Sequence, residues 1–480
     1  MENSPKIVII GAGSLFFGRK LVWAVNKLEG LTNAHLAMVD TDPQHLEQMM
    51  KLAETVKAET GANIKITGSE DFRSQLPGAD FVITSFSHRN AHYRGVDVQI
   101  SAKHGVRMCS GDTIGPGGVF RFLREIPNVM EIDAAVAEIC PKAWLINYIN
   151  PSTVIGIALS RYGKTRGRNF ALCDSLHLPW LRHSWLRQLG LDPEKDDPEF
   201  TLKIAGANHF TWMLEATLRG EDLMPQFIRS LQAAGREEPA DAEAKALYNK
   251  RIAGALAPVF GAIPVCVAHT KEYLPYFQGY GAHVEEECVP PLSLFEHEKR
   301  EVMTRKVWDA IAEFNSGEKP ISEFLEKNGS DHATDIIQAI WNDSGRHFFV
   351  NLNNQGSVPN LPDDAFLELE CVVDRQGPRP LPVGEMPLGL RALQMRVLDT
   401  HELTVEAYIK KDRQLLVRAL AVDPIVNSLA TAEALLTDLY AAQSDILEDW
   451  IAPPAASESA AQQAVPATGE ALELGQTRIG

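Results

Sequence analysis

A glycine-rich stretch near the amino terminus has the residue types that bind a dinucleotide. Residues 6–10 form an apolar run that predicts a buried strand, Gly11-Ala-Gly13-Ser14 follows, and a predicted helix begins soon after. Glycines at such a junction let the backbone approach a pyrophosphate, whose charge the helix amino terminus stabilises. Asp40 ends the next predicted strand, where a carboxylate can hold a ribose 2′-hydroxyl and repels the 2′-phosphate of NADP. The pattern predicts NAD binding by Gly11, Gly13, Ser14 and Asp40; a structural glycine turn followed by a capping aspartate is the alternative.

The usual third glycine position of this loop is occupied by Phe16, and Gly18 comes two residues later. Further along, Asn147 and Asn150 follow another predicted strand, where amide side chains can reach a ligand in the crevice of an open α/β sheet. We therefore predict a cofactor contact for Asn147. An Asx-Pro turn explains the same residues equally well.

A second glycine-rich run, Asp112-Thr-Ile-Gly-Pro-Gly-Gly, lies before a predicted helix, and Arg121 and Arg124 follow within it. So many turn residues next to a helix amino terminus predict backbone that passes close to an anion. The alternative is a structural loop with a solvated basic face.

Cys173 and His209 could bind a metal together. Cys173 ends a predicted strand, and Gly206-Ala-Asn208-His209 lies near the start of the second half. A thiolate and an imidazole suit a borderline divalent ion such as Mn²⁺, Fe²⁺, Co²⁺ or Zn²⁺, and two protein ligands would leave positions for substrate hydroxyls. By residue type alone, two packed residues without a metal explain this pair more simply.

The composition limits the partners of the chain. Among 480 residues, 63 are acidic and 46 basic, for a net charge of −17. This charge argues against binding to nucleic acid or to an anionic membrane surface, because both need a basic face, but a local basic pocket could still hold an anionic small substrate. We expect no signal peptide and no membrane helix, six reduced cysteines and a cytoplasmic location.

Alternating strands and helices must position these residues. Strands are predicted at 6–10, 34–39, 79–85, 143–149 and 169–172, with helices between them, and this alternation is typical of a parallel sheet. The fold class predicted is α/β: a Rossmann-type doubly wound parallel sheet over residues 1–196, and an α+β domain over 197–451 for substrate, metal and oligomerisation. That domain is expected to contain a different, antiparallel sheet that begins with strands 200–205 and 210–219. Residues 452–480 have no aromatic side chain and are predicted to be a disordered tail.

The order of the motifs is more specific than any single motif. After the first glycine loop come Arg94-x-x-Asp97, the Asp112 run, Asn147-Tyr-x-Asn150-Pro, Cys173-Asp174, Gly206-x-Asn208-His209, Glu272-Tyr273-Leu-Pro-Tyr-Phe and Asp423-Pro424. From about residue 5 to about residue 450, this order closely resembles glycoside hydrolase family 4, the NAD- and divalent-metal-dependent glycosidases.

The resemblance implies a mechanism in which redox chemistry serves bond cleavage. Bound NAD⁺ takes hydride from C3 of the sugar, a base removes the acidified C2 proton, a metal stabilises the enediolate, and the aglycone leaves C1. Water then adds and the same NADH returns its hydride, so NAD is not consumed. The resemblance further implies a homodimer or homotetramer, and Mn²⁺ is the metal expected.

The resemblance also implies a role for each matching residue. Cys173 and His209 match the metal ligands, and Asn150 and Asn208 match residues that contact the sugar. Tyr273 is the candidate C2 base, with His269 as its rival. Asp174 is the candidate general acid, although a capping role is the alternative.

The substrate is less constrained. Cys173-Asp-Ser-Leu-His differs from the Cys-Asp-Met-Pro, Cys-Asn-x-Pro and Cys-His-Ser-Val segments typical of family branches, and Asp174 favours an α-glucoside. Arg94 could hold an anionic C6 group or be structural, so neutral, phosphorylated and carboxylated sugars stay open. The alternatives are a net dehydrogenase of the malate or lactate type, against which the metal pair and the Tyr273 segment argue, and a catalytically silent NAD-responsive regulator.

Overall fold

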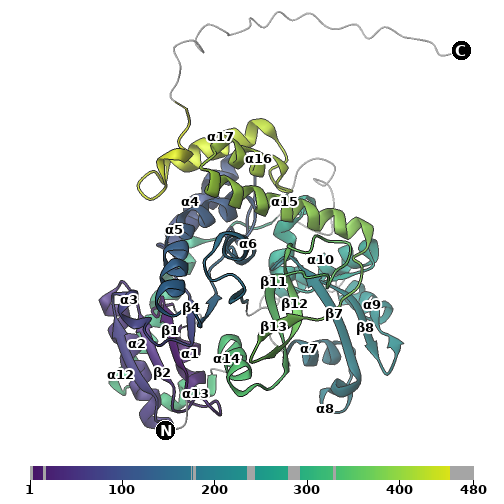
Figure 1. Cartoon of the computed structure of the whole chain (residues 1–480). Helices are drawn as coiled ribbons and strands as arrows, with labels where there is room; N and C mark the ends of the chain where they lie inside the picture. The colour runs from purple at the N-terminus through teal and green to yellow at the C-terminus, as the bar shows by residue number, and fades with distance from the viewer. Residues whose placement is uncertain are drawn as a thin grey trace, which may run out of the picture.

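The computed structural model describes residues 4–14, 18–173, 176, 180–234, 244–278, 292–327 and 331–454. Within this part, one sheet of 13 strands extends through both halves of the chain (Figure 1). Its first part has the order β3-β2-β1-β4-β5-β6, and every pair in it is parallel. This is the strand order of dinucleotide-binding folds, as the sequence predicts. The strands are β1 (Lys6–Ile10), β2 (His35–Val39), β3 (Lys65–Ser69), β4 (Phe81–Thr84), β5 (Trp144–Asn147) and β6 (Asn169–Ala171).

Helices cover both faces of the parallel part because its strands are apolar on both sides. In β1, Ile7 and Ile9 belong to one hydrophobic core and Val8 and Ile10 to another, so alternate residues face opposite helical layers. The helices of this half are α1 (Gly18–Val25), α2 (Pro43–Thr60), α3 (Phe72–Gln75), α4 (Asn90–Lys103), α5 (Gly115–Ile139), α6 (Ser152–Tyr162), α7 (Trp180–Gln188) and α8 (Pro193–Asp196).

The antiparallel strands of the second half continue the same sheet. They follow β6 in the order β11 (Arg346–Asn353), β12 (Phe366–Asp374), β7 (Phe200–Gly206), β8 (Trp212–Leu218) and β10 (Ile263–Pro264). In addition, β13 (Gly377–Pro380) pairs with β12, and β9 (Glu221–Asp222) pairs with β8. The prediction of a different sheet was therefore wrong. The reason is that β11 lies antiparallel along β6 and pairs with the edge that β6 would otherwise expose.

A single row of paired residues crosses this junction. Asn351 of β11 lies opposite Ala171 of β6 and also opposite Glu368 of β12, which in turn lies opposite Gly206 of β7. Neighbouring strands lie only about 5 Å apart, so the row brings together chain segments that are distant in the sequence. Cys173 follows one end of the row, and Asn208 and His209 follow the other.

The remaining helices pack around the sheet, and the last of them return to the amino-terminal half. They are α9 (Met224–Ala234), α10 (Ala244–Phe260), α11 (Val267–Thr270), α12 (His297–Ser316), α13 (Ile321–Lys327), α14 (His332–Asn342), α15 (Leu388–Lys410), α16 (Arg413–Val422) and α17 (Leu429–Ala441). In Figure 1, α16 and α17 (yellow) lie beside α4 and α5, and α17 packs against both. The predicted tail lies outside the described residues from 455 onward.

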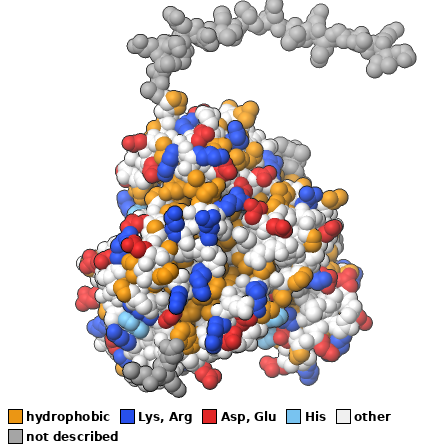
Figure 2. Space-filling view, in the orientation of Figure 1, with side chains coloured by type: hydrophobic (Ala, Val, Ile, Leu, Met, Phe, Trp, Pro, Cys, Tyr) orange, Lys and Arg blue, Asp and Glu red, His pale blue; other side chains and the backbone are white. Residues whose placement is uncertain are grey.

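Among the described residues, no helix has the length and apolar character required to span a membrane. Although the net charge is −17, Figure 2 shows Lys and Arg side chains gathered in the middle of one face, over apolar surface. The acidic composition is thus compatible with local basic surface.

Candidate active site

The first glycine loop connects β1 to α1 beside the carboxyl end of β4. Gly11 has φ +91°, and a Cβ there would collide with the carbonyl oxygen of Ser85. A Cβ on Gly13 would lie 2.9 Å from Oδ2 of Asp40, which accepts a hydrogen bond of 2.8 Å from the Gly13 amide. The loop backbone is therefore tightly packed, and the Asp40 carboxylate lies at its edge. Its shape fits the pyrophosphate and ribose of a dinucleotide.

Gly18 performs the packing role of the missing third glycine. A Cβ on Gly18, the first residue of α1, would collide with the carbonyl oxygen of Ala12, and the Gly18 amide donates to the carbonyl of Ser14 at 2.8 Å. Only glycine lets the helix start this close to the loop. Gly11, Gly13, Ser14 and Asp40 thus lie together, and their binding of NAD stays a prediction.

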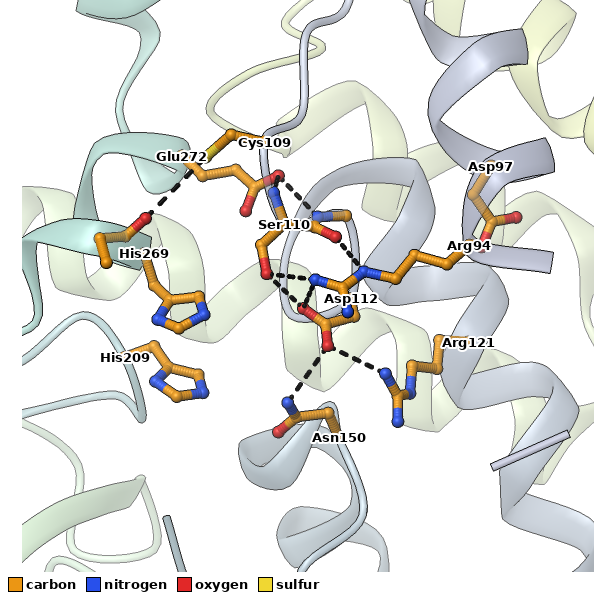
Figure 3. Close-up of polar contacts among 12 residues, drawn as sticks. Arg94, Asp97, Cys109, Ser110, Asp112, Arg121, Asn150, His209, His269 and Glu272 are labelled. Atoms are coloured by element: carbon orange, nitrogen blue, oxygen red, sulfur yellow. Dashed lines mark hydrogen bonds and ion pairs between the residues drawn. The ribbon is translucent and has the colours of Figure 1, made fainter. Parts of the chain in front are cut away.

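A buried ionic cluster is centred on Asp112. Its Oδ2 accepts from Arg121 Nη1 at 2.9 Å and from Asn150 Nδ2 at 3.4 Å, and its Oδ1 accepts from Ser110 Oγ at 2.7 Å (Figure 3). Arg94 Nη2 lies 3.4 Å from Oδ1. Burial by itself would raise the pKa of Asp112, but the two guanidinium groups outweigh it and hold the pKa well below its usual value. Asp112 is therefore a fixed anion beside Asn150.

The arginines of this region are buried and not on a solvated face. Arg94 donates to the Ser110 carbonyl oxygen and, at 2.7 Å, to Ser110 Oγ, and it stacks over Phe295 at 4.1 Å. To contact the C6 group of a sugar, Arg94 would therefore have to bind the substrate and Asp112 at the same time. Arg124 instead makes a bidentate ion pair with Asp97, at 2.8 and 3.2 Å. The second glycine run is thus a loop that arginine–carboxylate pairs hold in place.

Asn147 and Asn150 lie at the carboxyl end of β5 with different surroundings. The Asn147 side chain is fully buried, accepts from Thr84 Oγ1 at 3.0 Å, and exchanges hydrogen bonds with the backbone of Ile149. It shapes the turn into the cis Asn150-Pro151 bond. Asn150 is only partly buried and points toward Asp112, so it is the more available of the two.

Cys173 and His209 lie side by side, as the predicted metal pair requires. Cys173 Sγ is 3.6 Å from Nδ1 and 3.7 Å from Nε2 of His209. Burial lowers the pKa of His209 to about 4, so its imidazole is neutral and can offer a lone pair. The donor set, one thiol and one neutral imidazole, fits a borderline divalent metal. Asp174, the predicted general acid, lies outside the described residues.

Two further residues join this pair. Cys266 Sγ lies 3.6 Å from His209 Nδ1 and 3.3 Å from His269 Nδ1. The rings of His209 and His269 stack with their centroids 4.0 Å apart (Figure 3). Our sequence reasoning missed Cys266 and treated His269 only as a rival base. The Cys266-x-x-His269 spacing was the signal that could have revealed both.

Tyr273 is buried against the turn that carries His209. Its hydroxyl donates to the Asn208 carbonyl at 3.0 Å, and its ring stacks on Phe210 at 5.1 Å. Burial raises the pKa of Tyr273 well above its usual value, so action as a base would require a cation nearby. The preceding Glu272 accepts from the Ser110 and Gly111 amides at 3.1 and 2.8 Å, which ties this segment to the Asp112 loop.

The turn from β7 to β8 is held by Gln394 of α15. Gln394 accepts from the Ala207 amide at 3.0 Å and donates to the Phe210 carbonyl at 2.6 Å. Between these contacts, His209 adopts φ +66°. The amide of Asn208 also donates to Thr153 Oγ1 at 3.1 Å. A single buried glutamine therefore closes the turn that presents two candidate site residues.

Comparison with known families agrees with this geometry. A family model described as "Family 4 glycosyl hydrolase" matches residues 6–177, and one described as "Family 4 glycosyl hydrolase C-terminal domain" matches residues 204–426. The two matches together cover most of the chain.

The chain belongs to glycoside hydrolase family 4. An α-galactosidase of Bacillus subtilis is 28% identical over 454 residues, which are 93% of this chain and 99% of the relative. An α-galacturonidase of the same organism is 28% identical over 452 residues, 90% of this chain and 96% of the relative. A 6-phospho-α-glucosidase from gut microorganisms, solved with NAD and Mn²⁺, superimposes with a TM-score of 0.77 at 21% identity, over 93% and 99% of the two chains.

Family 4 membership confirms the predicted enzyme class and fold. The protein is a glycoside hydrolase with a Rossmann-type parallel sheet, and the predicted cofactors, NAD and a divalent metal, agree with the complex of the solved relative. One residue of the site that sequence reasoning missed is Glu368 of β12, a fully buried carboxyl close to Cys173 and the His209 backbone. Burial raises the pKa of Glu368 well above its usual value.

Proposed function

We propose that this family 4 enzyme cleaves an α-glycoside, a glucoside or a C6-modified relative, through transient oxidation at C3 of the sugar. The observation that carries this proposal is the position of the Cys173–His209 pair, 3.6 Å apart, at the carboxyl end of a Rossmann-type sheet. Ligands of open α/β sheets bind at this edge. The pair also argues against the alternative, a net dehydrogenase of the malate or lactate type.

The cofactor sites follow from the first glycine loop and the donor set. Gly11, Gly13, Ser14, Asp40 and Asn147 are assigned to NAD, and Cys173 and His209 to a divalent metal, with Mn²⁺ as the first candidate. When bound, NAD supplies a hydride acceptor that later returns the hydride, and the metal supplies a Lewis acid that orients two hydroxyls. Asn147 contributes mainly by shaping the turn after β5, since its amide is engaged there.

The chain's own residues bind and orient the sugar. Asn150 and Asn208 are assigned to sugar hydroxyls, and Arg94 to the C6 side. Asp112 is held as an anion beside Asn150, so it fixes the orientation of that amide. Tyr273 accepts the C2 proton in this proposal, with His269 as the rival base. Asp174 donates a proton to the leaving group.

A panel of aryl α- and β-glycosides tests this function. The sugars should be neutral, 6-phosphorylated and 6-carboxylated, and each should be assayed with and without NAD⁺, Mn²⁺ and a thiol reductant. We expect α-glycoside cleavage that needs trace NAD⁺ and yields no net NADH. Stoichiometric NADH would support the dehydrogenase alternative, and NAD⁺ binding without turnover of any glycoside would support the regulator.

A second arm in D₂O tests the elimination route. Removal and return of the C2 proton would place deuterium at C2 of the released sugar. Product without deuterium at C2 would exclude this route even if the glycoside is cleaved.

We also propose a cytoplasmic homodimer or homotetramer in which residues 1–196 bind NAD and residues 197–451 complete the substrate site and the subunit contacts. Large apolar side chains that are mostly exposed support self-association, such as Val259 at 76% and Leu388 at 78%. Light scattering on the purified full chain measures the state, and a monomer at micromolar concentration would contradict the proposal.

A further inference from the structure

We propose that Glu368 of β12 is a positioning residue for the turn that presents Asn208 and His209, and that it sets the affinity of the site for its divalent metal. This inference rests on the proposed function in taking Cys173 and His209 as the metal ligands. Glu368 itself binds neither the metal nor the sugar in this inference, and it acts only through its neighbours.

Strand pairing places Glu368 between the two arms of the site. It lies opposite Asn351 of β11 on one side and opposite Gly206 of β7 on the other, and Asn351 lies opposite Ala171 of β6. Residues directly opposite one another point to the same face of a sheet, so this row has two polar side chains between two small residues. Because Gly206 has no side chain, the row offers Glu368 a polar neighbour on the Asn351 side alone.

The groups around the Glu368 carboxyl are hydrogen-bond donors. They are the backbone amide of His209 and the side-chain amides of Asn208 and Asn351. The Cys173 thiol is also close to the carboxyl. Cys173 belongs to one arm of the site and His209 to the other, so a single carboxyl lies next to both. Its two oxygens have enough acceptor positions for all three donors.

These polar atoms are close to one another but are not yet paired. Glu368 and Asn351 are fully buried, and Asn208 is 2% exposed. Both oxygens of Glu368, both polar side-chain atoms of Asn351 and Nδ2 of Asn208 have no hydrogen-bond partner among the described residues. Buried polar atoms without partners destabilise a fold, whereas an apolar side chain of the same length would not. The stability of the sheet therefore does not explain a carboxyl at this position.

The work of the turn does explain it. Hydrogen bonds in a site are often long without ligand and shorten in the complex. When His209 binds the metal and Asn208 binds the sugar, the donors of the turn close on Glu368, which then fixes the imidazole and the amide in place. Residues that orient metal ligands in this way change metal affinity by about 10- to 100-fold.

Mn²⁺ binding, measured without substrate, tests the inference. Free Mn²⁺ gives an electron paramagnetic resonance signal that is lost on binding, so titration of the reduced full-length chain gives the Kd. Glu368→Met keeps the length of the side chain and removes both acceptor oxygens, and we expect it to weaken Mn²⁺ binding at least about 10-fold. Glu368→Gln keeps one acceptor oxygen and should recover part of this loss.

Glu370→Met is the matched control. Glu370 is in the same strand, but its carboxylate pairs with the exposed His347 at a distance of 2.9 Å. We expect the Mn²⁺ affinity of this variant to equal that of the original chain. Equal losses in Glu370→Met and Glu368→Met would show a general effect of β12 and would overturn the inference.

Thermal stability separates positioning from a structural role. Because the Glu368 oxygens make no hydrogen bond within the described part of the chain, we expect the Tm of metal-free Glu368→Met to equal or exceed that of the original chain. Its NAD⁺ affinity should not change. A clear fall in Tm, or a variant that does not fold, would assign Glu368 to the stability of the sheet and overturn the inference. Unchanged Mn²⁺ affinity in Glu368→Met, or an affinity in Glu368→Gln no better than in Glu368→Met, would overturn it too.

A reference variant keeps this inference apart from the proposed function. If Cys173→Ser binds Mn²⁺ as tightly as the original chain, the proposed metal pair is wrong and this inference fails with it. If Cys173→Ser loses Mn²⁺ binding and Glu368→Met does not, only the role of Glu368 is wrong. Neither readout involves glycoside turnover, so the two failures are distinguishable.

Discussion

At the scale of single residues, burial decides the chemical state of the candidate site. His209 and His269 are kept neutral because burial lowers their pKa values to about 4 and about 3. Asp112 is equally buried but stays ionised, because Arg94 and Arg121 compensate its charge. Neutral imidazoles next to a fixed carboxylate suit metal and hydroxyl binding, and none of these states can be read from residue types alone.

Cys173→Ser separates metal chemistry from cofactor binding. Serine is a poor ligand for a borderline ion, so we expect metal affinity to fall by at least about 100-fold and glycoside cleavage to be lost with it. NAD⁺ affinity should not change, because the glycine loop is on different strands of the sheet. Calorimetric titration with NAD⁺ and a turnover assay measure both. Cys140→Ser is the control, and normal turnover by Cys173→Ser would mean that the metal site is elsewhere.

Glu272 should make the stability of the metal-free protein depend on pH. Burial raises the pKa of Glu272 to about 7 in the folded state, from about 4.5 when unfolded. The folded protein therefore binds the Glu272 proton more tightly than the unfolded chain does. Protonation of Glu272 stabilises the folded state fully below pH 4.5, and this stabilisation is lost as the pH rises to about 7. The upper limit of this loss is about 3 kcal/mol.

Glu272→Gln isolates this contribution, because glutamine cannot ionise and its oxygen can still accept from the Ser110 and Gly111 amides. We expect the difference in Tm, variant minus original chain, to increase as the pH rises from 4.5 to 7. Above pH 7 this difference should stay constant. Scanning calorimetry without metal or NAD measures this difference. A Tm difference that is independent of pH would show that Glu272 has an ordinary pKa.

At the scale of elements, close backbone contacts position the binding loops. Helix α1 starts against Ala12, the glycines of the second run pack against their own loop, and Gln394 closes the turn before β8. The second run is also tied to the C-terminal region, since the Asp423 carboxylate accepts from the Gly115 amide at 3.0 Å. These contacts explain why glycine, glutamine and aspartate occur at positions where no direct ligand contact is needed.

Gly18→Ala should weaken NAD⁺ binding through α1. The new methyl group would collide with the Ala12 carbonyl, so the helix must move away from the loop that its amino terminus supports. Overpacking of this kind costs about 1–3 kcal/mol, and we expect a loss of about 10-fold in NAD⁺ affinity. Fluorescence titration with NADH gives the affinity. Gly389→Ala is the control, because a Cβ there would only approach Phe260 to 3.9 Å. Equal affinities in the two variants would contradict this role for Gly18.

At the scale of the whole molecule, one sheet and its returning helices make the two halves interdependent. The sheet passes from parallel to antiparallel pairing between β6 and β11, next to the candidate metal site. In the amino-terminal half, Gln443 after α17 donates to Asp97 at 2.8 Å and accepts from Arg124 at 2.5 Å. The C-terminal part of the chain therefore supports the amino-terminal half.

Asp97→Ala should destabilise the whole protein. It would leave the Arg124 guanidinium buried without its carboxylate, which costs about 3–5 kcal/mol in comparable cases. We expect a clear fall in Tm by scanning calorimetry, and partial recovery when Arg124→Met is added. Lys195→Ala, which removes an exposed ion pair with Asp192, should change stability by less than about 1 kcal/mol. Comparable effects of Asp97→Ala and Lys195→Ala would exclude the buried pair as a major contributor.

Local patterns in the sequence determined the first half of the fold and much of the site. The apolar run of β1, the glycines after it and Asp40 belong to one strand–helix–strand unit, in which the Gly13 amide contacts Asp40, and the order of the motifs was sufficient to indicate the family. Only the tertiary structure decided what depends on pairing between distant strands. It joined the parallel and the antiparallel strands into one sheet at Asn351, and it brought Cys266 and His269 to His209 through β8 and β10. Residue types can predict a donor, but only the fold decides which donors meet, because burial and strand register are properties of the whole chain.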